Sequence, residues 1–356
     1  MIKKRSNIIF CLAVLFGASL LWVSCSTSPG INDGLNLSGE FSYQALEGYR
    51  IFELQSHESE LFAGTSNGLV QFERSFPLQV SDAYLNNGEV RTFLILEDNY
   101  WLASIRFENS DSTNLYRSTN KGEAWHTYNN GFGGENKWVP STMDFTRSDP
   151  LIIYARPYAS NVAKSTDLGA SWESVHHTWE NPYLETSMFV KVDRNNQNIV
   201  WAGGATALFY PQLIRSKDDG ETWEYVRLFE DFIETTVYDV AIHHQTSNRI
   251  MTGLGIGVRR STDDSETWKS IFNEAAIFTF THSARNPEVV YASGINQNGT
   301  LFFTASNNFG DSWEIVEFES GSTQIWVNDM ISVLQNGKEV LYFGTNQGLY
   351  SYTFEN

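Results

Sequence analysis

The chain has 356 residues, of which 24 are lysine or arginine and 42 are aspartate or glutamate, so its formal net charge is −18. A protein this acidic has no basic surface for phosphate backbones, which excludes nucleic-acid binding. With only Cys11 and Cys25, a disulfide scaffold, a cysteine-rich zinc site and an iron–sulfur cluster are excluded as well. Aromatic residues make up 14% of the chain, which indicates a folded protein and not a disordered one.

The first 24 residues have the pattern of a secretory signal peptide. Lys3, Lys4 and Arg5 form a positive segment, and residues 7–23 are an apolar run of 17 residues, short for a stable membrane span. The run ends at a small residue that is followed by Cys25. This ending resembles the lipobox of bacterial lipoproteins, although Trp22 stands where that family usually has leucine.

The lipobox resemblance implies that residues 1–24 are removed and that Cys25 is lipidated as the first residue of the mature chain. Residues 25–37 then hold the lipidated cysteine and a flexible tether. We expect an exported bacterial membrane lipoprotein that faces the periplasm or lies on the cell surface, and that touches the membrane only through its N-terminal lipid. The alternative is an ordinary signal peptide followed by an unmodified Cys25.

A strand in which an aromatic or apolar residue precedes small residues recurs seven times. Its copies are residues 61–64, 100–104, 153–155, 200–203, 250–253, 290–293 and 341–344. Most copies follow a polar turn such as residues 147–150, which reads as a hairpin between two strands. Each unit of about 47 residues has room for four antiparallel strands and cannot bury both faces alone. The pattern predicts an all-β fold, a single seven-bladed propeller over residues 38–356.

An octapeptide recurs in units two to six, at intervals of 47, 51, 45 and 45 residues. It has serine at position one, Asp or Asn at position three, glycine at position five in four copies, and tryptophan at position eight. These positions are Ser118, Asn120, Gly122 and Trp125; Ser165, Asp167, Gly169 and Trp172; Ser216, Asp218, Gly220 and Trp223; Ser261, Asp263 and Trp268; and Ser306, Asn308, Gly310 and Trp313. The pattern resembles the Asp-box, or BNR repeat.

The residue types of the octapeptide suit a tight turn between the third and fourth strands of a unit. The polar side chain at position three accepts hydrogen bonds from backbone N–H groups, and glycine supplies a positive φ. The tryptophan packs into the blade. Ser265 replaces the glycine in the fourth copy, where we expect mild strain. A structural role is therefore the favoured interpretation of all five copies.

The two ends of the predicted propeller complement each other. The last unit ends at residues 348–354 with a third strand, and residues 40–46 form an extra alternating strand before the first unit. We predict that this N-terminal strand completes the seventh blade as its outermost member, which pairs an otherwise open edge. Six blades with a stray hairpin is the alternative, because the first and seventh units lack the octapeptide.

Candidate ligand-binding residues come from the loop face, the side of the disc opposite the octapeptides. Five aromatic residues there lie outside the repeat positions: Trp138, Tyr158, Trp179, Tyr183 and Trp326. Exposed aromatic rings beside carboxylates and amides suit the stacking of a sugar ring or contact with a protein partner. The competing interpretation is that these rings pack between the blades.

Two adjacent histidine pairs, His176-His177 and His243-His244, raise the question of a metal. Neighbouring residues of a strand point to opposite faces, so neither pair chelates easily, and no third ligand lies at a useful spacing. We therefore predict no metal site and no cofactor.

The repeats also resemble those of sialidases, whose first strand carries arginine in a Phe/Tyr-Arg-Ile-Pro motif. Residues 49–52 place Arg50 at that position without the proline, and no further arginines or Tyr–Glu pair of the family can be assigned. Arg50 joins the candidate ligand face. Xyloglucanases share the repeats too, but they use two propellers, and this chain has length for one. The catalytic residues are thus unknown.

The better match over residues 40–354 is with non-catalytic propellers. Residues 344–350 and 64–70 resemble the Gly-Thr-x-x-Gly-Leu turns of sortilin-type and photosystem-assembly-factor-like propellers. That resemblance implies a protein that binds peptides or assembly clients through the ring. We expect a monomer that binds a protein or glycan partner through its loop face. A glycoside hydrolase with a divergent active site, sialidase-like or xyloglucanase-like, is the alternative.

Overall fold

The computed structural model describes residues 35–75, 78–97, 99–107, 113–128, 132, 140–157, 161–177, 185–206, 208–318 and 324–355. Residues 35–356 form one compact unit. The predicted signal peptide, Cys25 and most of the predicted tether lie outside the described residues. Where the chain is described, it has no helix of the length and apolarity needed to cross a membrane.

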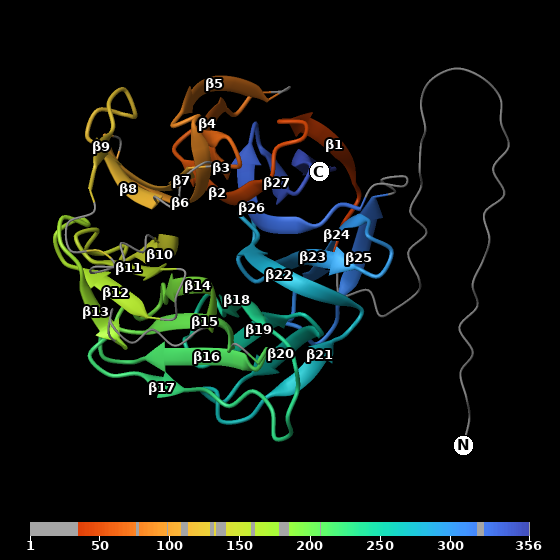
Figure 1. Ribbon diagram of the computed structural model, residues 1–356. Coiled ribbons are helices and arrows are strands. Elements are labelled where there is room, and N and C mark those ends of the chain that lie inside the picture. Colours follow the sequence, from red (N-terminus) through yellow and green to blue (C-terminus); the bar gives the residue numbers. More distant parts are fainter. Residues whose placement is uncertain are drawn as a thin grey trace, which may run out of the picture. The chain divides into compact units, whose positions relative to one another are not determined.

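Seven four-stranded antiparallel sheets are arranged around a ring, as Figure 1 shows. The first three blades are β2 (Ile51–His57), β3 (Glu60–Thr65), β4 (Gly68–Glu73) and β5 (Gln79–Tyr84); β6 (Gly88–Glu97), β7 (Tyr100–Phe107), β8 (Thr113–Ser118) and β9 (His126–Thr127); and β10 (Pro140–Phe145), β11 (Ile153–Pro157), β12 (Val162–Ser165) and β13 (Glu173–His176). In each of them the strands follow one another in chain order, from the inner strand to the outer one.

The next three blades repeat this order. They are β14 (Glu185–Val192), β15 (Val200–Thr206), β16 (Pro211–Ser216) and β17 (Glu224–Tyr225); β18 (Val237–Ile242), β19 (Ile250–Leu254), β20 (Gly257–Ser261) and β21 (Lys269–Phe272); and β22 (Ala275–His282), β23 (Val290–Asn296), β24 (Leu301–Ser306) and β25 (Glu314–Phe318). The predicted all-β propeller of seven four-stranded blades is confirmed.

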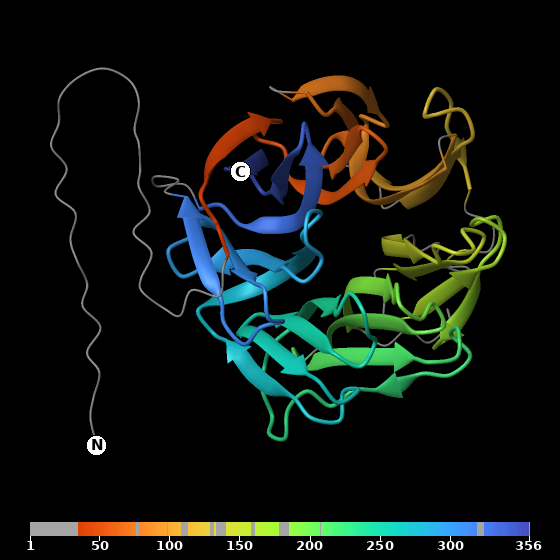
Figure 2. The ribbon, with the colours of Figure 1, turned by 180° about the vertical axis from the view of Figure 1, so that it is seen from behind.

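The seventh blade closes the ring with both ends of the chain. It holds β26 (Val327–Gln335), β27 (Lys338–Thr345) and β28 (Gly348–Phe354), and its fourth strand is β1 (Gly39–Ala45). In the β1–β28 pair, Phe41 stands opposite Tyr352 and Tyr43 opposite Tyr350. Figures 1 and 2 show β1 beside the C-terminal strands. The predicted closure is confirmed, and the six-blade alternative is wrong.

The small residues of the second strands allow neighbouring blades to approach closely. A Cβ on Gly64 of β3 would lie 2.7 Å from the carbonyl oxygen of Val90 in the next inner strand. A Cβ on Gly253 of β19 would lie 2.7 Å from the carbonyl oxygen of Ile277, again in the next inner strand. Since real side chains do not come that close to backbone, larger residues here would push the blades apart. The buried apolar residues accordingly form a separate cluster for each blade interface.

Candidate functional site

The octapeptide turns are the segments 118–125, 165–172, 216–223, 261–268 and 306–313, and they close on their own polar groups. In the third turn the Ser216 hydroxyl donates to Asp218 Oδ1 at 2.9 Å and accepts from the backbone N of Gly220 at 2.8 Å. Asp218 Oδ1 also accepts from the backbone N of Thr222 at 2.8 Å. The same three bonds recur in the other four turns.

Two further features of the octapeptide turns agree with a structural role. Hydrogen bonds from the side chain and backbone of Thr267 lower the pKa of Asp263 to about 2, so this carboxylate stays ionised as an acceptor. Ser265 has a φ of 71°, close to the 82° of Gly122 at the same position of the first turn. A serine is therefore held in the left-handed region that glycine prefers, as expected from the sequence.

The loop face carries a ring of side chains that the sequence did not single out. Each of the seven inner strands has a register shift near its start, which leaves one extra residue without a partner on the second strand. We call these residues the collar: Phe52, Arg91, Ser141, Met188, Tyr238, Phe278 and Asn328. All seven are partly exposed. The inner strands start at the loop face, so the collar lies opposite the octapeptide turns.

Polar bonds between neighbouring inner strands hold the collar in place at all seven blade junctions. The bonds are Glu53 to Phe93 N, Thr92 to Met143 N, Asp144 to Val192 N, Lys191 to Asp239, Asp239 to Phe280 N, Thr279 to Asp329, and Asp329 to Leu54 N. Their donor–acceptor distances run from 2.5 Å for Lys191–Asp239 to 3.3 Å for Glu53–Phe93. Backbone and side chains of adjacent blades are thus tied together directly behind the collar.

Two carboxyl groups of this network have strongly shifted pKa values. Burial, followed by repulsion from Asp329, raises the pKa of Glu53 to about 8. Burial raises the pKa of Asp329 to about 6. Paired acids with separated pKa values occur in catalytic sites, but here each carboxyl accepts a backbone N–H of the next blade. Accepting hydrogen bonds between blades is therefore a sufficient structural reason for the presence of both carboxyl groups.

The collar has a sector with guanidinium groups and an apolar sector. Two guanidinium groups lie over the ring of Phe52, with Arg50 Cζ 5.2 Å and Arg91 Cζ 5.3 Å from its centroid. Arg91 pairs with Glu89 at 3.0 Å, whereas Arg50 reaches Asn328 Oδ1 only at 3.5 Å. Burial and the neighbouring Arg91 lower the pKa of Arg50. On another part of the collar, the rings of Tyr238 and Phe278 lie 4.4 Å apart.

The structure brings two of the sequence-predicted ligand residues to this region. Arg50 immediately precedes β2 and contacts the collar residue Phe52. Trp326 immediately precedes β26, is partly buried, and donates its backbone N–H to Asn346 Oδ1 at 2.9 Å. Trp138, Tyr158, Trp179 and Tyr183 lie outside the described residues. In the sequence the bulged residue often precedes a polar–apolar pair such as Glu53-Leu54 or Asp329-Met330, but such pairs also occur in ordinary alternating strands and do not mark the collar.

The second histidine pair corrects an expectation from strand geometry. His243 and His244 follow β18 in a turn, and their rings lie 4.7 Å apart. With Glu288 of the next blade they offer three ligand atoms within 4.8 Å of one another. However, the backbone N of Gln245 donates to His243 Nδ1 at 3.2 Å, which puts the proton of neutral His243 on Nε2, the nitrogen that faces Glu288. A metal needs that nitrogen bare, so these residues fit a hydrogen-bonded cluster better than a metal site.

Comparison with known proteins gives the fold and no family. No protein-family model and no curated protein matches the chain. The GH74 xyloglucanase from Xanthomonas campestris superposes with a TM-score of 0.67 at 14% identity, over 88% of this chain and 53% of the enzyme. YCF48 bound to D1 peptide superposes with a TM-score of 0.65 at 9% identity, over 89% of this chain and 97% of YCF48.

A third similar structure is the extracellular domain of the hybrid two-component system BT4673 from B. thetaiotaomicron. Its TM-score is 0.65 at 13% identity, over 90% of this chain and 40% of the other. The chain therefore spans about half of the xyloglucanase and less than half of the BT4673 extracellular domain. These proteins share the seven-bladed propeller with this chain, and the identities are too low to carry more than the fold.

Proposed function

We propose that this propeller is a non-catalytic binding module that holds a peptide segment of a partner protein on its collar. The observation that carries the proposal is the collar itself, a ring of partly exposed residues on bulges that a hydrogen-bonded network keeps rigid. Preorganised side chains lose little entropy on binding, which favours affinity.

The chemistry of the collar favours a peptide over a sugar. Phe52, Met188, Tyr238 and Phe278 offer apolar and aromatic contacts of the kind enriched in protein interfaces. The guanidinium of Arg50, with one long hydrogen bond to Asn328, suits a carboxylate of the partner. YCF48, a protein of the same fold, has been seen with a D1 peptide bound, which supports peptide binding by such a propeller.

Binding of a peptide library by the protein without residues 1–24 tests the proposal. We expect Tyr238→Ala and Phe278→Ala each to weaken the selected peptide about tenfold, since interface anchors contribute about 1–2 kcal/mol. Tyr225→Ala is the matched control, because Tyr225 is 63% exposed on the outer strand β17 and lies outside the collar. Equal binding by wild type and both collar variants contradicts the proposal. Selection of a glycan in place of a peptide from a parallel array contradicts the choice of partner.

Glycoside hydrolysis is the second candidate, supported by the similarity to a xyloglucanase and by the position of Arg50 on the loop face. A screen of fluorogenic glycosides separates the two, because any turnover excludes a purely binding role. Arg50→Lys removes bidentate carboxylate recognition and keeps the charge. A sialidase-like enzyme would lose nearly all activity with this change, whereas the folding of the propeller would be unaffected.

We further propose that the module is exported and anchored to a bacterial membrane through lipidated Cys25. The support is the positive segment, the apolar run and the small residue before the cysteine. Metabolic labelling with a radioactive fatty acid tests this. We expect label on the wild type and none on Cys25→Ser, which should also leave the membrane fraction. Label on Cys25→Ser, or none on the wild type, contradicts the anchor.

A further inference from the structure

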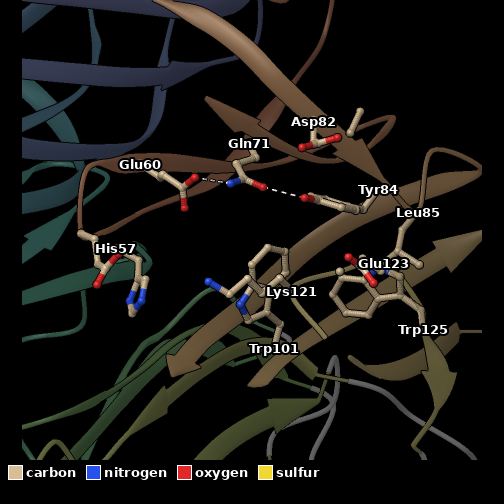
Figure 3. A pocket seen from close by; sticks show the side chains of 13 residues that line it. His57, Glu60, Gln71, Asp82, Tyr84, Leu85, Trp101, Lys121, Glu123 and Trp125 are labelled. Carbon is tan, nitrogen blue, oxygen red and sulfur yellow. Dashed lines mark hydrogen bonds between the residues drawn. The ribbon is translucent and has the colours of Figure 1, made fainter. Parts of the chain in front are cut away.

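A pocket of about 640 Å³ lies at the rim of the ring, between the first and second blades. Its walls come from the β2–β3 hairpin, the outer half of the first blade and the first octapeptide turn, as Figure 3 shows. The pocket shares no residue with the collar. A function here is therefore independent of the function proposed for the loop face.

The lining of the pocket is acidic and aromatic. Four of its residues are carboxylic acids, Glu58, Glu60, Asp82 and Glu123, against one lysine. Within the part of the chain that the structure describes, no ion pair reaches any of these four carboxylates. Burial, and then the charges of Asp82, Glu60 and Glu123, raise the pKa of Tyr84 to about 12.

Aromatic rings form the inner wall of the same pocket. The ring centroid of Tyr84 lies 5.4 Å from that of Trp101 and 6.4 Å from that of Trp125. A Cβ on Gly122 would lie 2.7 Å from ring atoms of both Tyr84 and Trp101, so a larger residue in this turn would displace the two rings. Aromatic faces next to carboxylates attract cations by two mechanisms, the ring quadrupole and the full negative charges.

In three later blades, a positively charged side chain lies at the position that corresponds to this pocket. In blades three, four and five, one cation of the third strand reaches the next octapeptide turn. All three cations reach the carbonyl oxygen at position four of that turn: Lys164 Nζ lies 2.7 Å from Asp219 O, Arg215 NH2 lies 3.3 Å from Asp264 O, and Arg260 NH1 lies 2.7 Å from Phe309 O. Each also pairs with an aspartate of the turn, at position four for Lys164 and Arg215 and at position six, Asp311, for Arg260. The first octapeptide turn has Lys121 at position four, and it keeps an acid, Glu123, at position six.

The first blade has a neutral residue at this register position. Gln71 pairs with Phe62 of the second strand as Lys164 pairs with Tyr154 and Arg215 with Trp201. Its amide stays within its own blade: Gln71 Nε2 donates to Glu60 Oε1 at 2.5 Å, and Gln71 Oε1 accepts from the Tyr84 hydroxyl at 2.6 Å (Figure 3). No cation of the first blade therefore crosses to the first octapeptide turn from this position.

We propose that the rim pocket binds an organic cation, an ammonium or guanidinium group on an alkyl chain, at the place that Lys164, Arg215 and Arg260 fill in later blades. The carboxylates of Glu60, Asp82 and Glu123 hold the charge, and the rings of Tyr84 and Trp125 contact the alkyl carbons. The cation comes either from a free polyamine or from a basic side chain of a peptide.

Calorimetric titration of the full protein with spermidine and with a trilysine amide tests the proposal and distinguishes the two sources. We expect one or both to bind, fully acetylated trilysine amide and glucose not to bind, and affinity to fall as salt is raised. Glu60→Gln, Asp82→Asn and Glu123→Gln should each weaken binding about fivefold, the effect of losing one partly exposed charge pair. Glu221→Gln is the matched control, since Glu221 has the position of Glu123 in the third octapeptide turn and lies outside the pocket.

A second variant fills the pocket from within. Gln71→Lys places an ammonium where Lys164 has one, so it should abolish binding of both cations and leave the far-UV circular dichroism unchanged. Several results overturn the proposal: absence of binding by the wild type, equal losses in Glu221→Gln and Glu123→Gln, retention of binding by folded Gln71→Lys, or preference for glucose over the cations.

Discussion

Truncation of Phe41 to alanine tests whether the N-terminal strand closes the ring through its side chains. The ring of Phe41 lies 4.7 Å from that of Tyr352, 5.4 Å from Phe318, 5.8 Å from Phe343 and 6.0 Å from Phe303. It thus joins β1 to three strands of the seventh and sixth blades besides its own neighbour β28.

The expected loss follows from the burial of this ring. Replacement of a fully buried phenylalanine by alanine costs about 3–5 kcal/mol, and partly buried Phe41 should cost about 2 kcal/mol. For a domain of this size, that lowers the Tm by about 4 °C. Thermal and urea unfolding followed by circular dichroism measure both quantities.

Tyr43→Ala is the control in the same strand. Tyr43 is 44% exposed and contacts Tyr350 at 5.3 Å, so its truncation should cost less than about 1 kcal/mol. Equal stability losses in the two variants, or no loss for Phe41→Ala, would refute the closure of the ring by aromatic packing and leave only the backbone ladder as its cause.

Three further predictions concern stability. The pKa of Glu53 is raised to about 8, so the folded state binds its proton more tightly than the unfolded state, and stability should fall as pH rises from about 4.5 to about 8. Glu53→Gln should remove this fall and gain about 1–2 kcal/mol at pH 8, measured by urea unfolding at both pH values; an unchanged pH profile contradicts it. Ser216→Ala leaves the N–H of Gly220 without its acceptor and should cost about 1–2 kcal/mol. Ser265→Gly relieves a positive φ and should stabilise the fold by about 0.5 kcal/mol, which raises the Tm by about 1 °C; a lower Tm argues against strain.

The number of blades follows from the sequence because it depends on a local pattern, and the closure of the ring follows from the strand count, since the last unit has three strands and one extra strand precedes the first. The small-residue strands return seven times, and each needs small residues because the next inner strand lies against it, as at Gly64 and Gly253. The octapeptide turns are equally local, since every hydrogen bond that defines them joins residues within four positions. Such contacts are readable from residue order alone.

The collar and the rim pocket could not be predicted in this way. Phe52 and Tyr238 are ordinary strand residues in the sequence, and only the pairing of their strands leaves them as bulged residues. The neutral side chain of Gln71 likewise becomes informative only when the register of β4 is compared with that of β12 and β16, where Lys164 and Arg215 stand at the same position. Both observations depend on which residue stands opposite which.

Residue order by itself therefore determined the architecture, since periodic short-range contacts specify the strands and the tight turns, and the strand count leaves the N-terminal strand to complete the seventh blade. Tertiary structure alone decided where ligands can be held. A binding site needs groups such as Arg50 and Asn328, or Glu60 and Trp125, that lie far apart along the chain and meet only after the blades have closed. It also decided that His243 and His244 share one side of a turn, because the chain leaves the strand just before them.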